Sequence, residues 1–133
     1  MTAAGGQRAT FVLSSEVMSV EQITSATSHP GDFTLARGAI REGATAPIPA
    51  RVSSWEIHED ADNVAEAVER LFRRLRPLHD QLRELTGLGC SATFYIVQHL
   101  APGSDLGFAI DADDLRLLAD LGAFIDVDQY SDS

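Results

Sequence analysis

The chain has 133 residues, 44% of them hydrophobic, which predicts one globular domain rather than a disordered segment. Its formal net charge of −10 disfavours nucleic acids and anionic membranes and favours a basic partner. All ten basic residues are arginine, so Schiff-base chemistry and a P-loop lysine are excluded, and Cys90 alone cannot form an intrachain disulfide or a cysteine-based zinc cluster.

Residues 1–8 are small and polar and are expected to form a flexible tail before a single domain over residues 9–133. No apolar run approaches the roughly 20 residues that a membrane span needs, and no signal sequence is recognisable. These features predict a cytoplasmic protein without a membrane partner.

The first strand is expected over Ala9–Ser14, which is β-branched and aromatic. A helix then begins at Ser19, because Ser19 and Gln22 have the spacing of a capping box, and it ends before Pro30-Gly31. Residues 30–50 form a long loop, which is functional or mobile and has room for a short strand within residues 33–40.

Arg51–Glu59 alternates in polarity and predicts a half-buried strand anchored by Trp55. A long helix is expected from Asp62 onward, with an apolar stripe from Val64 to Leu85. Pro77 lies inside that stripe and predicts a kink or break near Arg76, because proline lacks the amide donor that the helix needs.

Ser91–Leu100 is apolar at successive positions and is expected to be a central strand covered on both faces. After a turn at residues 101–105, a short strand is predicted over Gly107–Ile110. A helix capped by Asp111 and ended by Gly122 then leads to a last strand, Phe124–Tyr130. The resulting order β-α-β-α-β-β-α-β predicts a two-layer α+β sandwich, a relative of the ferredoxin-like fold, whose mainly antiparallel sheet carries helices on one face.

This order resembles the bacterial domain-of-unknown-function family 4279 over residues 9–130. The similar pieces are Val20-Glu21-Gln22-Ile23-Thr24, His29-Pro30, Arg37-Gly38, Trp55, the Leu71–Leu85 helix with Pro77, and the tail Leu115–Tyr130. The chain departs from the family pattern at Thr27-Ser28, where a glycine is expected, and in the missing glycine at the end of the first strand. The resemblance implies the fold and a mostly intracellular bacterial setting, and it supplies no catalytic residue.

Asp126, Asp128 and Tyr130 share one face of the last strand, which places the two carboxylates about 7 Å apart. Such a pair could hold a hard cation or act in acid–base chemistry, but a solvated strand face gives the same spacing. The four histidines are far apart, and no glycine-rich, zinc-hydrolase or nucleophile motif occurs. The sequence therefore predicts no catalytic residue, metal or cofactor.

Arg37 and Arg51 lie in and beside the long loop, and with Trp55 they would frame a small anionic or aromatic pocket. His58 lies on the polar face of the Trp55 strand, where it is either a ligand-binding residue or simply exposed.

Residues 105–133 contain eight aspartates and a single basic residue, Arg116. The favoured hypothesis is a non-enzymatic protein-interaction domain that presents this region to a basic protein, one form of which is an immunity-like protein covering a toxin's active cleft. The alternative is a small-molecule or anion-binding domain built from residues 30–51 and Trp55. A homodimer sealed through an edge strand is compatible with either.

Overall fold

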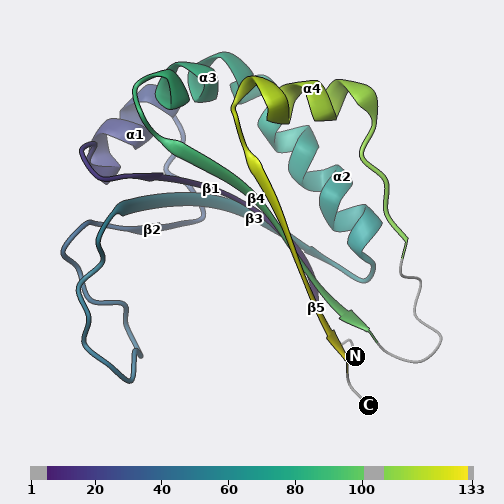
Figure 1. The fold of residues 1–133 in the computed structure, drawn as a ribbon, viewed down its shortest axis with the longest axis horizontal. Coiled ribbons are helices and arrows are strands. Elements are labelled where there is room, and N and C mark those ends of the chain that lie inside the picture. Colours follow the sequence, from purple (N-terminus) through teal and green to yellow (C-terminus); the bar gives the residue numbers. More distant parts are fainter. Residues whose placement is uncertain (1–5, 101–106, 132–133) are drawn as a thin grey trace.

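The computed structural model describes residues 6–100 and 107–131 (Figure 1). Its strands are β1 (Gln7–Ser15), β2 (Phe33–Leu35), β3 (Ser53–Ala61), β4 (Ser91–Leu100) and β5 (Phe124–Ser131). Its helices are α1 (Val20–Thr27), α2 (Val64–Leu75), the 3₁₀ turn η1 (Arg76–Leu78), α3 (His79–Gly87) and α4 (Ala112–Asp120). No helix in these two ranges has the length and apolarity needed to cross a membrane.

The strands form one sheet in the order β2-β3-β1-β4-β5, and all neighbours are antiparallel except β4 and β5, which are parallel. The helices lie on one face of this sheet (Figure 1), which confirms the predicted α+β fold. The expectation that Ser91–Leu100 is the central strand with both faces covered was wrong. β1 occupies the centre, and β4 buries only the side chains that point toward the helices.

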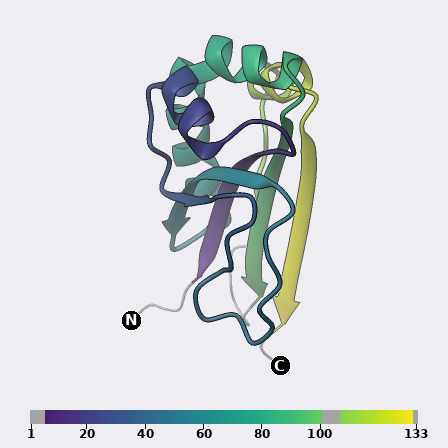
Figure 2. The same cartoon turned by 90° about the vertical axis from the view of Figure 1, so that its left-hand side faces the viewer.

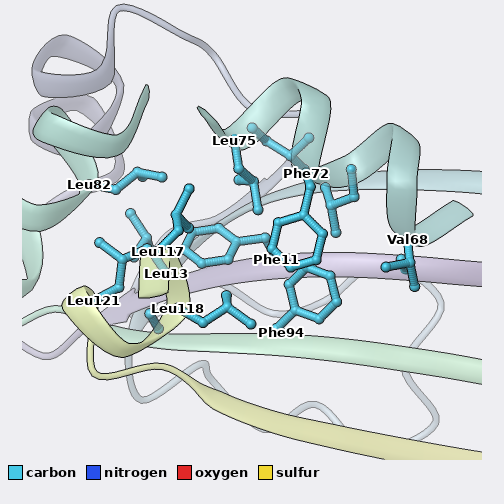
Figure 3. Packing of buried hydrophobic residues seen from close by; sticks show 14 of the residues in the cluster. Phe11, Leu13, Val68, Phe72, Leu75, Leu82, Phe94, Leu117, Leu118 and Leu121 are labelled. Atoms are coloured by element: carbon cyan, nitrogen blue, oxygen red, sulfur yellow. The ribbon is translucent and has the colours of Figure 1, made fainter. Parts of the chain in front are cut away.

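The core lies between the helices and the sheet. The apolar stripe of the long helix is buried as predicted, and Phe72 of α2 stacks on Phe94 of β4 with ring centroids 4.7 Å apart. Figure 3 shows these rings beside Phe11 of β1, with Leu117 and Leu118 of α4 closing the same cluster. Burial of these side chains supplies most of the driving force for docking the helix layer.

The long helix is interrupted where Pro77 predicts it. α2 ends at Leu75, Pro77 lies within η1, and α3 continues the path from His79. The N-terminal cap differs from the expected Asp62, because the side chain of Asn63 accepts the amide of Glu66 at 2.8 Å. The capping box of Ser19 and the cap of α4 by Asp111 are confirmed.

Two local expectations differ from the structure. No strand forms over Gly107–Ile110, and β1 begins at Gln7 rather than Ala9. A short strand does form inside the long loop, as β2, and it pairs with β3. The predicted turn over residues 101–105 and most of the predicted tail lie outside the described residues.

The segment between β2 and β3 leaves the sheet as an arm. Its two sides are joined by a bridge between Ile40 and Pro49 and by a hydrogen bond from Gly38 N to Ala50 O of 2.8 Å. Figures 1 and 2 show the arm projecting from the end of the sheet on the side away from the helices. The long loop is therefore ordered by its own backbone pairing and packs little against the core.

Candidate functional site

The sheet face opposite the helices, which we call the open face, is the main surface that no other layer covers. Alternation along each strand and the register between strands assign its side chains. They are Arg8, Thr10, Val12 and Ser14 of β1, Ser54, Glu56, His58 and Asp60 of β3, Thr93, Tyr95, Val97 and His99 of β4, and Phe124, Asp126, Asp128 and Tyr130 of β5.

β5 is the outermost strand at one side of the sheet (Figure 2). Four of its large side chains are substantially exposed: Phe124 71%, Ile125 46%, Val127 40% and Tyr130 49%. Ile125 and Val127 point to the helix side, in register with Phe94 and Ile96 of β4, yet the helix layer leaves them half exposed. Exposed apolar side chains therefore lie on both faces of an edge strand.

The carboxylates of Asp126 and Asp128 lie among these apolar side chains. We define the β5 surface as Phe124, Ile125, Asp126, Val127, Asp128 and Tyr130. The hydroxyl of Tyr95 donates a hydrogen bond to Asp128, and this bond raises the pKa of Tyr95 to about 12. Tyr130 stacks on His99 with centroids 5.4 Å apart. The neighbouring strand thus holds Asp128 and Tyr130 in fixed positions.

Most other aspartates of the C-terminal region are already engaged in the fold. Asp111 caps α4, Asp114 lies 2.7 Å from Arg76, Asp113 lies 2.7 Å from Arg116, and Asp120 lies 3.1 Å from Nε2 of His79. By contrast, none of the ion pairs of the described residues includes Asp126 or Asp128. Asp105 and Asp132 lie outside those residues. Within residues 107–131, Asp126 and Asp128 are therefore the aspartates that take part in neither an ion pair nor a helix cap of the described residues.

The opposite side of the sheet is built differently. Arg74 of α2 lies 2.7 Å from Asp32 and 2.9 Å from Glu59, and it also donates to the carbonyl of His58. Its hydrogen bonds lower the pKa of Asp32 to about 2. Asp32 and Glu59 are thus paired with an arginine on this side, whereas Asp126 and Asp128 on β5 pair with no cation of the described residues.

Trp55 does not contribute to a ligand pocket. Its side chain is completely buried, and its indole N–H donates to the carbonyl of His29 at 2.9 Å. Gly31 passes so close that an added Cβ would lie 2.9 Å from the indole nitrogen, and its φ of +75° also favours glycine. The predicted grouping of Trp55 with Arg37 and Arg51 is wrong, because the indole faces the core.

The two arginines of the arm lie on neighbouring segments, since the Gly38–Ala50 hydrogen bond joins the residues next to them. Arg37 donates to the carbonyl of Glu16 and lines a hollow of about 210 Å³ at the start of α1. Glu16 and Glu21 line the same hollow, which makes it a poor anion site. Arg51 is exposed on the arm.

His58 shares the open face with Asp126, Asp128 and Tyr130, but β1 and β4 lie between them, a separation of about 14 Å. Its Nδ1 is buried without a hydrogen-bond partner and lies 3.9 Å from Oε1 of Glu56. Burial raises the pKa of the Glu56 carboxyl. His58 therefore belongs to a second polar group on β3, separate from the β5 surface.

The described residues contain no group of three or more His, Cys, Asp and Glu side chains placed to hold a metal ion. The carboxylates of Asp126 and Asp128 lie instead next to exposed apolar side chains of the same strand.

Two residues of the site were not predicted from the sequence, Tyr95 and His99 of β4. The continuous apolar middle of that strand suggested a fully buried strand. Two signals identify these residues. Side chains of β4 alternate between the two faces, and Tyr95 and His99 lie on the face opposite the buried Phe94 and Ile96. The parallel register then places Tyr95 beside Asp126 and His99 beside Tyr130.

Comparisons with known proteins give one result. The sequence model of a family described as Domain of unknown function (DUF4279) matches residues 5–132, nearly the whole chain. Neither the curated proteins nor the solved structures include a match. The match agrees with the resemblance seen in the sequence, and the chain belongs to the DUF4279 family.

Proposed function

We propose that this protein is a cytoplasmic, non-enzymatic interaction domain that binds a basic protein through the β5 surface. An immunity-like protein that covers the basic cleft of a toxin is one form of this function. The observation that carries the proposal is an edge strand with exposed apolar side chains on both faces and two carboxylates that no cation of the described residues neutralises.

Electrostatics favour a basic partner over an acidic or neutral one. The chain carries a net charge of −10, so its long-range field attracts cationic proteins and accelerates their association. At short range, Asp126 and Asp128 provide the specific positions where arginine or lysine would pair. Phe124 and Tyr130, which flank the two carboxylates on the same face, would exclude water and strengthen those pairs.

A cytoplasmic setting is consistent with the state of the single cysteine. Cys90 is buried, and burial raises the pKa of its thiol, so it is held as a protonated, unreactive side chain.

The anion-binding alternative has weaker support. Of its three residues, Trp55 is in the core and Arg37 is engaged with the backbone of Glu16. A thermal-shift screen of phosphate, nucleotides and carboxylates tests it directly. Stabilisation by one of these ligands that is lost in Arg51→Ala would favour the alternative over the interaction surface.

The proposed function is tested with a pair of variants that change the charge equally. Asp126→Asn/Asp128→Asn removes the two charges on β5, and Asp62→Asn/Asp80→Asn removes two exposed charges elsewhere, as a control. Once a partner has been purified, its affinity for each variant is measured at low and high salt. We expect the β5 pair to weaken binding by about tenfold and to flatten the salt dependence, and the control pair to change binding by less than about twofold. Equal effects of the two pairs would refute the β5 surface as the binding site.

A further inference from the structure

We propose that the partner binds by strand addition: an extended segment with alternating basic and apolar residues pairs with the outer edge of β5. This inference rests on the proposed function and specifies how the β5 surface is used. It names the backbone of β5 as a binding element in addition to its side chains.

The position of β5 leaves one side of its backbone available. One side pairs with β4 from Phe124 to Ser131, and no strand of the described residues pairs with the other. The amide and carbonyl groups on that outer side are a template for a further strand, because each of them needs a hydrogen-bond partner. An added strand would extend the sheet from five strands to six.

The side chains of β5 define what such a strand must carry. Residues opposite each other in neighbouring strands point to the same face, with Cβ atoms about 5 Å apart. On the open face the added strand would meet Asp126 and Asp128, which favours arginine or lysine. On the helix side it would meet the half-exposed Ile125 and Val127, which favours valine, isoleucine or leucine. Alternation of basic and apolar residues follows from these two requirements.

A hollow of about 550 Å³ lies at the start of β5, where the strand leaves α4. Its lining includes Arg83, Thr86, Ser91 and Asp120 together with Ala92, Leu121 and Phe124. Phe124 belongs both to this hollow and to the β5 surface, so the end of an added segment would reach the hollow.

Charge argues against a second copy of the chain as the occupant. In an antiparallel pairing of two β5 strands centred on Val127, Asp126 lies opposite Asp128 of the second copy, and the same pair recurs by symmetry. Registers centred on Asp126 or Asp128 place that carboxylate opposite its own counterpart. Like charges directly opposite destabilise strand pairing, and each copy carries a net charge of −10.

The first test uses a defined probe, a blocked synthetic peptide of eight residues in which arginine and valine alternate. Its affinity is measured by titration calorimetry against the wild-type protein, Asp126→Asn/Asp128→Asn and Asp62→Asn/Asp80→Asn. We expect saturable binding to the wild type, a loss of about tenfold or more in the β5 pair, and a change below about twofold in the control pair. Absence of binding to the wild type, or equal loss in both variants, would overturn the proposal.

The second test separates strand addition from simple charge attraction. Two further peptides keep the same side chains but carry N-methyl groups on one alternating set of residues or on the other. In strand addition the amides of only one set point toward β5, so methylation of that set abolishes binding and methylation of the other set is tolerated. Equal effects of the two patterns would show that backbone pairing does not occur.

The outcomes distinguish this inference from the proposed function. If the natural partner depends on Asp126 and Asp128 but the two methylation patterns are equivalent, the interaction surface stands and strand addition fails. If the natural partner is insensitive to both carboxylates, the proposed function fails. Sedimentation that shows a dimer which dissociates in Val127→Lys would identify a second copy as the occupant and overturn the proposal.

Discussion

The two sides of the sheet differ in how far their acidic groups are paired and their large side chains are buried. On the side of β2 and β3, Arg74 ties Asp32 and Glu59 to α2, Arg8 pairs with Asp60 at 2.8 Å, and Trp55 is buried. On the β5 side, four large side chains are exposed, and two carboxylates pair with no cation within residues 6–100 and 107–131. Asp32, Glu59 and Asp60 of the first side are thus paired with arginines of the chain, whereas Asp126 and Asp128 of the second side pair with no cation of the described residues.

This difference explains how an apolar edge strand can be tolerated. Exposed edges promote aggregation unless charges or bulges oppose self-pairing. Asp126 and Asp128 supply such charges, which would repel another copy of β5. Under the proposed function the same two residues would also attract a basic strand.

The largest expected effect compares one aromatic residue on each side. Trp55→Ala on β3 removes a fully buried side chain with a satisfied indole N–H and is expected to lower the free energy of unfolding by about 3–5 kcal/mol. Phe124→Ala on β5 removes a side chain that is 71% exposed and should change it by less than about 0.5 kcal/mol. Urea unfolding of both variants measures the contrast, and similar losses would show that β5 is part of the core.

The next largest effect is on the pH dependence of stability, through the ion pair between Arg74 and Asp32 on the side of β2 and β3. Arg74→Met removes the guanidinium that lowers the pKa of Asp32, which should rise from about 2 toward its ordinary value of 3.8. Ionised Asp32 stabilises the wild type above about pH 4, and this contribution is lost as the pH falls through 2. The variant should therefore be less stable by about 1 kcal/mol at neutral pH, after allowance for solvent screening, and should match the wild type near pH 2.

Unfolding curves at several pH values measure this convergence. A constant difference between the two proteins down to pH 2 would mean that Arg74 acts by packing rather than through Asp32.

A spectroscopic effect is expected on the β5 side. The chain has two tyrosines, so Tyr130→Phe leaves Tyr95 as the one phenol to titrate. In that background the pKa of Tyr95 should lie near 12, and Asp128→Asn should lower it toward 10, because the carboxylate accepts the phenolic proton in a hydrogen bond. The raised pKa means that this bond stabilises the fold below pH 10 and is lost between pH 10 and 12. Tyrosinate absorbance against pH gives the values, and an unchanged titration in Asp128→Asn would contradict the contact.

The smallest effect on stability is expected at Val127, in the middle of the edge strand β5. Val127→Thr keeps the β-branched shape and should alter the free energy of unfolding by less than about 0.5 kcal/mol, since the side chain is 40% exposed. It should nevertheless weaken partner or peptide binding by several-fold, because the apolar contact on the helix side is lost. A variant that binds as tightly as the wild type would remove Val127 from the interface.

Much of the fold could be predicted because the patterns involved are local. The stripe from Val64 to Leu85, the break at Pro77, the capping box at Ser19 and the glycine stop at Gly122 each depend on neighbouring residues alone. Strand order depends on long-range pairing. For that reason the central place of β1 and the one-sided cover of β4 could not be predicted.

The same distinction between local patterns and long-range contacts applies to the candidate site. Asp126, Asp128 and Tyr130 were correctly assigned to one face, because alternation along a strand is local. Trp55 was correctly expected to anchor its strand, and only its grouping with Arg37 and Arg51 in a pocket does not fit, because that grouping depends on how the arm packs. The selection of two carboxylates from eight aspartates also required the structure, because Arg76 and His79 lie far away in sequence from the residues that they neutralise.

The central claim is that the outer edge of β5 pairs with an added strand, and amide hydrogen exchange along residues 124–131 tests it most directly. In the free protein, amides that point toward β4 should exchange slowly and the alternate amides that point outward should exchange fast. Saturation with the arginine–valine peptide should protect the outward set and leave the rest of the sheet unchanged. Protection that appears elsewhere, or binding without any change in the alternate amides of β5, would contradict the account.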